Sequence, residues 1–367
     1  MASSEVLLKE PGQFIAAVPA LLGFVPQRSL VVVVLRRPQP ETPHEVHVAV
    51  RLDLPTADRY SPLSRRVVQI CRRSDAVAAL VVVVDDRITR PEGRRGASTP
   101  VRYLAERLRE DLAEFDIALL GAWAVPSITV AAQWHNVDEP QSCGILPDPL
   151  ASQLAARQVY DGLMQHSSRE ELAASIAVDE KLRERVSDAL PAVVADAQRR
   201  LARAIQINNP DAYTRMNLWQ VMSVITRTYE AVEIPAHTIA EVAVALRDKD
   251  VRDVMFGVAG GAHAQAAERL WDVLTRALPA PDRAEAATLL AFHAYLRGDG
   301  ALAGVALEQA LASDPEHHMA VLLDTALQTA MNPARLNRLV RTGIAAAADL
   351  RIDIGHAATD SETEAAR

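Results

Sequence analysis

The sequence predicts an α/β N-terminal domain with a mixed sheet, followed by an all-α C-terminal domain with tetratricopeptide-like helical hairpins. Two runs of β-branched residues, 29–36 and 76–84, are too short and too rich in valine for helices, and such runs are typical of strands covered on both faces. Helical patterns alternate with strand patterns up to about residue 148, whereas only helical patterns follow. We therefore expect domains at 1–148 and 149–347, and a polar, disordered tail at 348–367.

The chain opens with a short apolar helix that leads into the first buried strand. In the stretch PGQFIAAVPALLGFVPQRSLVVVVL, apolar residues recur at helical spacing from Gly12 onward. Pro19 is expected to kink or end this helix one residue earlier, because proline lacks the N–H that a helix interior needs. Gly23 permits a turn into the strand at 29–36, which pairs with a second strand at 44–52 as a hairpin.

The remainder of the first domain continues the alternation of helices and strands. An amphipathic helix at 58–73 sets its apolar residues against four arginines, Arg65, Arg66, Arg72 and Arg73. The strand at 76–84 ends in Asp85-Asp86, and an Arg/Gly-rich loop follows it. A helix at 99–114 and strands at 117–125 and 128–134 complete this domain.

The second domain shows helical periodicity throughout. The expected helices lie at about 179–206, 210–231, 235–247, 263–277, 283–297, 299–312 and 315–330. The spacing of Ala303, Leu307, Ala310 and Pro315 is typical of the second helix of a tetratricopeptide repeat with its closing proline. The same spacing occurs 36 residues earlier in Ala267, Trp271, Leu274 and Pro279. We therefore expect repeat-like hairpins at about 262–330.

Bulk properties indicate a cytoplasmic globular protein without a membrane segment. The 367 residues have room for two ordinary domains, and no window reaches the roughly 18 apolar residues that a membrane span needs. The N-terminus MASSEVLLKEPG lacks the basic and apolar regions of a signal peptide. The two cysteines, Cys71 and Cys143, have neither metal-site spacing nor the pattern of a disulfide framework.

The charge distribution gives little support for nucleic-acid binding. The net charge is −8, with 17 basic and 18 acidic residues in 1–150 and 22 basic and 29 acidic residues in 151–367. A broad basic surface, the usual electrostatic mark of a nucleic-acid-binding domain, is therefore not expected. Only a local basic patch stays open as a nucleic-acid site.

Five segments resemble the domain of unknown function 4192 family, which is found in actinobacteria. They are the opening stretch quoted above, Arg51-Leu-Asp-Leu-Pro55, Ser168-Arg-Glu-Glu-Leu172, Val251-Arg-Asp253 and Arg297-Gly-Asp-Gly-Ala-Leu-Ala303. The resemblance spans roughly residues 10 to 335, so it implies that this range forms one family unit. It brings no activity, cofactor or site residue with it.

The Asp85-Asp86 pair is the first candidate for a ligand-binding site. In open α/β sheets ligands gather at the carboxyl ends of strands, and two carboxylates there can hold Mg²⁺ or act in acid–base chemistry. The more frequent alternative is a solvated strand end that caps the following turn. The adjacent loop carries Arg87, Arg90, Arg94 and Arg95, which can contact a phosphate or simply be solvated. Its glycines lack the spacing of nucleotide-binding loops, so no cofactor is assigned.

His135 is the remaining candidate, and no catalytic or metal-binding constellation accompanies it. It lies in Trp134-His135-Asn136 at a strand end, where it can bind a ligand or be an ordinary edge histidine. His317 and His318 are adjacent on a helix and point in different directions, so they do not form a metal pair. No HExxH, CxxC or GxSxG motif occurs, and we assign neither catalytic residues nor metal ligands.

Two functional hypotheses follow. The first is a non-enzymatic interaction or regulatory scaffold that contacts another protein through its helical domain, because stacked helical hairpins usually present a docking face. The second is an α/β enzyme or ligand-binding domain that acts on a phosphorylated small molecule through Asp85-Asp86 and the arginine loop. Nucleic-acid binding by that loop ranks last, and a homo-oligomer is open under either hypothesis.

Overall fold

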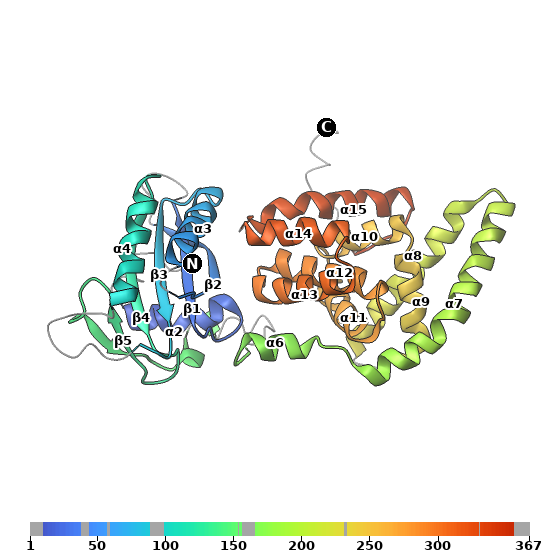
Figure 1. Ribbon diagram of the computed structural model, residues 1–367. Coiled ribbons are helices and arrows are strands. Elements are labelled where there is room, and N and C mark those ends of the chain that lie inside the picture. The colour runs from blue at the N-terminus through green and yellow to red at the C-terminus, as the bar shows by residue number, and fades with distance from the viewer. Residues whose placement is uncertain are drawn as a thin grey trace, which may run out of the picture. The chain divides into compact units, whose positions relative to one another are not determined.

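The computed structural model describes residues 10–37, 44–56, 59–88, 99–152, 154–155, 166–230, 233–329 and 331–355. The chain divides into two compact units, which we treat separately (Figure 1). The first contains residues 1–172 together with 328–331, and the second contains 173–327 and 332–367. The division expected from the sequence, at 148/149, lies earlier in the chain. None of the helices in the described ranges is both long and apolar enough to span a membrane.

The first unit is built on a mixed sheet, as the sequence predicts, and its six strands lie in the order β2-β1-β3-β4-β5-β6. Only β3 and β4 are parallel neighbours, and the other adjacent pairs are antiparallel. The helices are α2 (Pro11–Leu22), α3 (Tyr60–Arg73), α4 (Thr99–Ala113) and the 3-10 turn η2 (Pro149–Ala151). The strands are β1 (Ser29–Arg36), β2 (Glu45–Asp53), β3 (Ala78–Val84), β4 (Ala118–Val125), β5 (Gln133–Asn136) and β6 (Cys143–Ile145).

Helices cover both faces of this sheet, which is why its central strands are apolar throughout. Apolar side chains of α3 and α4 pack on one face and form the main core with alternate residues of β1, β3 and β4. On the other face, the Phe14 ring of α2 lies 5.4 Å from the Trp123 ring of β4. Cys71 belongs to the main core, and burial raises the pKa of its thiol to about 12.

The expectation that Pro19 ends the first helix is wrong, and the strand expected at 128–134 forms only from residue 133. Helix α2 continues past Pro19 to Leu22, and the Pro19 carbonyl accepts a hydrogen bond from the Gly23 N–H at 2.8 Å. The proline therefore costs one backbone donor without ending the helix. Residues 128–132 form a turn rather than a strand, because Ala131 takes a left-handed conformation with φ 61°, and the chain re-enters the sheet only at β5. The sheet then gains β6 in a segment where the sequence shows no strand pattern.

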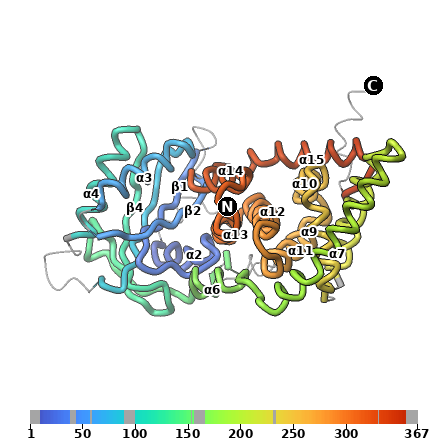
Figure 2. The backbone as a smooth tube through the Cα atoms, turned by 45° about the vertical axis from the view of Figure 1, so that its right-hand side comes forward, coloured from blue at the N-terminus to red at the C-terminus, as the bar shows by residue number. Residues whose placement is uncertain are grey.

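The second unit is helical, as the sequence predicts (Figure 2). Its elements, counted from the helix at the boundary, are α6 (Arg169–Ser175), α7 (Glu180–Gln206), α8 (Pro210–Arg227), η3 (Thr228–Glu230), α9 (Ala236–Leu246), α10 (Lys249–Val258), α11 (Ala264–Ala277), α12 (Asp282–Arg297), α13 (Gly300–Ser313), α14 (His318–Gln328), η4 (Pro333–Leu336) and α15 (Asn337–Asp349). Helix α7 packs mainly on α9, and α12 packs between α11 and α13.

Helices α10 and α15 are absent from the sequence-based expectation and pack closely against each other. At their crossing, Gly257 and Gly343 bring the two backbones into contact. The following segment, 350–355, belongs to the tail that was expected to be disordered from residue 348. It packs instead, because Ile354 is buried and the Gly355 carbonyl accepts a hydrogen bond from Ala262 at 3.2 Å. The packed chain therefore extends at least to Gly355.

Candidate functional site

Strand pairing brings Asp85 and Asp86 together with an arginine from a distant part of the chain. Because β1 and β3 are antiparallel, Ser29 at the start of β1 pairs with Val84 at the end of β3. Arg28 therefore lies beside Asp86, and its guanidinium donates two hydrogen bonds to that carboxylate, Nε to Oδ1 at 2.9 Å and Nη2 to Oδ2 at 3.0 Å.

Arg87 likewise makes a bidentate pair with the Asp85 carboxylate. Its Nε donates to Asp85 Oδ1 at 2.8 Å and its Nη2 donates to Oδ2 at 2.9 Å. The Arg87 backbone N–H donates to the same Oδ1 at 3.1 Å, so Asp85 also caps the turn that follows β3. Asp85 is buried, and the Asp86 side chain is 61% exposed. Each carboxylate thus has its own guanidinium partner at the carboxyl end of β3.

These pairs set the electrostatics of the strand end. The hydrogen bonds from Arg28 lower the pKa of Asp86, and the hydrogen bond to Asp86 raises the pKa of Arg28. The pKa of Arg87 is raised by its hydrogen bond to Asp85. Burial, and then the Asp85 charge, raise the pKa of Tyr60 on α3. Asp86 therefore stays ionised and engaged at neutral pH, and it is poorly suited to supply or accept protons.

The comparisons with known proteins give a family and no activity. The profile of the family described as Domain of unknown function (DUF4192) matches residues 11–334, which is most of the chain. The chain belongs to this family. No curated protein and no solved structure matches it. The DUF4192 match ends before α15, although α15 packs on α10 within the matched range.

Among the other sequence-predicted site residues of this DUF4192 chain, His135 does not join the aspartates. His135 lies on β5 opposite Ala124, which itself pairs with Val83 on β3. Two strand spacings separate His135 from β3, or roughly 10 Å. Burial lowers the pKa of His135, and its Nε2 is buried without a hydrogen-bond partner. Arg90, Arg94 and Arg95 lie outside the described residues.

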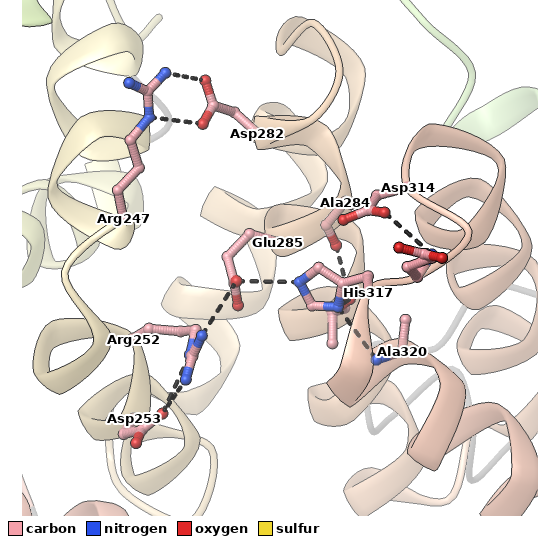
Figure 3. A network of polar contacts seen from close by, with 11 residues as sticks. Arg247, Arg252, Asp253, Asp282, Ala284, Glu285, Asp314, His317 and Ala320 are labelled. Carbon is pink, nitrogen blue, oxygen red and sulfur yellow. Dashed lines mark hydrogen bonds and ion pairs between the residues drawn. The ribbon is translucent and has the colours of Figure 1, made fainter.

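A second polar cluster links three helices of the helical unit (Figure 3). The Ala320 N–H donates to His317 Nδ1 at 3.2 Å, so the proton of a neutral His317 lies on Nε2, which is 3.1 Å from Glu285 Oε2. Arg252 Nη1 lies 3.9 Å from the same oxygen, and its Nη2 donates to Asp253 at 2.9 Å. The cluster connects α10, α12 and the start of α14. Nothing in the sequence pattern indicated this pairing, because its members are far apart in the chain.

Neither cluster forms a metal site among the residues that the structure describes, since these contain no group of three potential His, Cys, Asp or Glu ligands. At the end of β3 a carboxylate already occupies the Nε and Nη2 donors of both Arg28 and Arg87, so an anion would have to displace it to bind those two donors. The cluster in the helical unit is suited to fastening helices together. The geometry thus supports structural ion pairing more directly than proton transfer.

Proposed function

We propose that this protein is a non-enzymatic interaction or regulatory scaffold whose α7–α8 hairpin docks another protein. The observation that carries the proposal is a set of exposed large apolar side chains at this hairpin, between Leu201 and Trp219. The set contains Leu201, Ile205, Ile207, Met216 and Trp219, with exposed fractions from 38% to 69%. Apolar surface of this kind is costly to leave in water and is typical of interaction sites.

The charges of the same hairpin specify the chemistry of the partner. Residues 196–219 contain four arginines and two aspartates, a local charge of 4 − 2 = +2, and Asp196 pairs with Arg199 and Arg200. Of these arginines, Arg203 is exposed and has no ion pair with any carboxylate in the described part of the chain. We infer a protein segment that places apolar side chains against Met216 and Trp219 and carboxylates against the arginines.

The proposal also covers the repeat-like helices and the cellular location of the protein. Ala267, Trp271 and Leu274 on α11 are fully buried, as are Ala303, Leu307 and Ala310 on α13, which supports reading α11–α13 as tetratricopeptide-like hairpins. In this proposal the array is the rigid support of the docking hairpin. We place the protein in the cytoplasm of an actinobacterium, on its composition and the sequence resemblance.

Trp219 provides a direct test, because it is 69% exposed whereas Trp123, Trp134 and Trp271 are buried. A photo-crosslinking residue at Met216, introduced in the native host, should trap a discrete partner, and Leu322 on α14 is a matched control site with 50% exposure. A synthetic acidic, apolar segment of that partner should shift the Trp219 emission to the blue, and Trp219→Ser should abolish binding. The proposal fails if Met216 and Leu322 trap the same proteins. A trapped copy of this chain would indicate a homo-oligomer instead.

The alternative, an α/β domain that acts on a phosphorylated small molecule, is favoured by one observation. The edge of the sheet beside Asp85-Asp86 carries Arg28 and Arg87, and the arginine loop begins there. Calorimetric titration with a panel of sugar and nucleoside phosphates tests it. Binding that is weakened by Arg28→Gln and unchanged by Trp219→Ser would favour this alternative over the scaffold.

A further inference from the structure

The exposed face of α3 is an arginine surface, and it belongs to the unit that the proposed scaffold function does not use for docking. Helix α3 contains Arg65, Arg66, Arg72 and Arg73 and no acidic residue. At 100° per residue these four positions fall within roughly 120° of the helix circumference. Leu63, Val67, Val68, Ile70 and Cys71 on the opposite side are buried in the core of the sheet.

These arginines lack the carboxylate partners that their neighbours on α4 have. Arg102 pairs with Glu106 at 2.9 Å, Arg107 with Asp111 at 3.0 Å and Arg109 with Asp138 at 2.6 Å. No carboxylate in the described ranges pairs with any of the four α3 arginines, all of which are exposed. The nearest acidic residue after the helix, Asp75, is engaged by Arg36 at 3.2 Å.

Local structural roles account for only part of this surface. Arg72 and Arg73 lie in the last turn, where positive charge stabilises the helix dipole. Arg65 and Arg66 lie in the middle of the helix, where that effect is negligible. The apolar side of α3 is fully used by the core, so the helix cannot insert that side into a lipid surface. The arginine surface is therefore suited to a soluble polyanion.

An aromatic ring lies within the same surface. The Arg72 guanidinium stacks over the Phe115 ring, with its carbon 4.3 Å from the ring centroid, and Phe115 is 41% exposed. Bases of single-stranded nucleic acids stack on aromatic rings and guanidinium planes, a contact that a carboxylate cannot make. From Arg65 to Arg73 the surface extends about 12 Å along the helix axis.

We propose that the arginine face of α3 binds a single-stranded nucleic acid. Arg65, Arg66 and Arg73 contact the phosphates, and Arg72 with Phe115 receives a base. Guanidinium groups suit this role because their planar donors match phosphate oxygens in pairs. Recognition is independent of sequence, since no base-edge contact is implied. The acidic net charge of the chain does not oppose it, because at 0.15 M salt charges act over only about 8 Å.

The test is fluorescence anisotropy of a labelled 20-nucleotide single strand with the full-length protein at several salt concentrations. The variant Arg65→Gln/Arg66→Gln/Arg73→Gln should weaken binding on the order of 100-fold at 0.1 M salt and lower the salt slope by about 2, as expected for three lost phosphate contacts. The control Arg102→Gln/Arg107→Gln/Arg109→Gln removes the same charge from α4 and should bind like the wild type. The variant Arg65→Lys/Arg66→Lys/Arg73→Lys should keep the salt slope of the wild type. This result would show that the glutamine variant binds weakly because charge is lost and not because the protein is misfolded.

Three results would overturn the proposal. The first is no wild-type binding at 50 mM salt, and the second is equal weakening by the α3 and α4 variants. The third is equal displacement of the strand by polyglutamate at matched charge, which would indicate an acidic protein partner. Phe115→Ala should weaken single-strand binding more than duplex binding. None of these measurements involves Trp219, so they are independent of the docking function proposed for α7–α8.

Discussion

The contact between α10 and α15 gives a prediction whose sign opposes the usual effect of the substitution. A methyl group added at Gly343 would lie 2.7 Å from the Asp253 carbonyl oxygen and 2.8 Å from Gly257 Cα, both of which are backbone atoms. A glycine-to-alanine change inside a helix normally stabilises it by about 1 kcal/mol. Here the overlap requires the helices to separate, which costs about 3 kcal/mol. We therefore expect Gly343→Ala to lower the free energy of unfolding by about 2 kcal/mol.

Gly304→Ala on α13 is the matched control. A methyl group at that position would meet Leu327 Cδ2 at 3.4 Å, which is ordinary contact with a flexible side chain. The control should therefore gain up to about 1 kcal/mol, so that the two variants differ by about 3 kcal/mol. In a unit of this size the difference corresponds to about 6–12 °C in Tm, measurable by thermal circular dichroism. Equal stability of the two variants would refute the close approach of α10 and α15.

Three further predictions concern ionisation and reactivity. Burial lowers the pKa of His293 to about 4, so the unfolded chain takes up its proton first as the pH falls. The free energy of unfolding is therefore unaffected by His293 above pH 6.5, and it falls by up to about 3 kcal/mol as the pH is lowered to 4. Urea unfolding at several pH values should show this loss. His293→Gln should reduce the loss. Asp85→Asn should destabilise the protein by about 1–2 kcal/mol, because the buried carboxylate that pairs with Arg87 loses its charge, whereas Asp86→Asn should have little effect on the same unfolding curves. A thiol reagent should modify only the exposed Cys143 in native protein, and rapid labelling of buried Cys71 would contradict the core described above.

The fold class of both units could be predicted from the sequence because its signals are local. The valine runs at 31–34 and 81–84 predict strands covered on both sides, and both strands are central in the sheet. The Ala131 turn and α10 were missed because neither has a strong local signal. Ala131 adopts a positive φ that alanine rarely takes, and α10 has only ten residues and begins with charged ones.

The candidate site was less predictable, because its partners are brought together by long-range pairing. Asp85 and Asp86 are recognisable as a strand end, yet only the antiparallel register of β1 and β3 places Arg28 beside them. The cluster of Glu285 and His317 depends in the same way on the packing of separate helices. By contrast, the four arginines of α3 could be assigned to one face from helical spacing alone. The absence of carboxylate partners for them in the described ranges could not be predicted from the sequence.

The paired arginines and aspartates at the end of β3 have a consequence for any small anion that approaches them. Arg87 is tethered to its competitor Asp85 through a single intervening residue, so the local concentration of that carboxylate far exceeds that of any metabolite. A ligand phosphate must outcompete this internal occupant, which favours multiply charged ligands over singly charged ones. The Asp86 carboxylate, held by Arg28 at the start of the neighbouring strand β1, is the weaker competitor because both partners are exposed. An anion that bound at this strand end would meet Arg28 first, because its side chain is 65% exposed and its carboxylate partner is exposed as well.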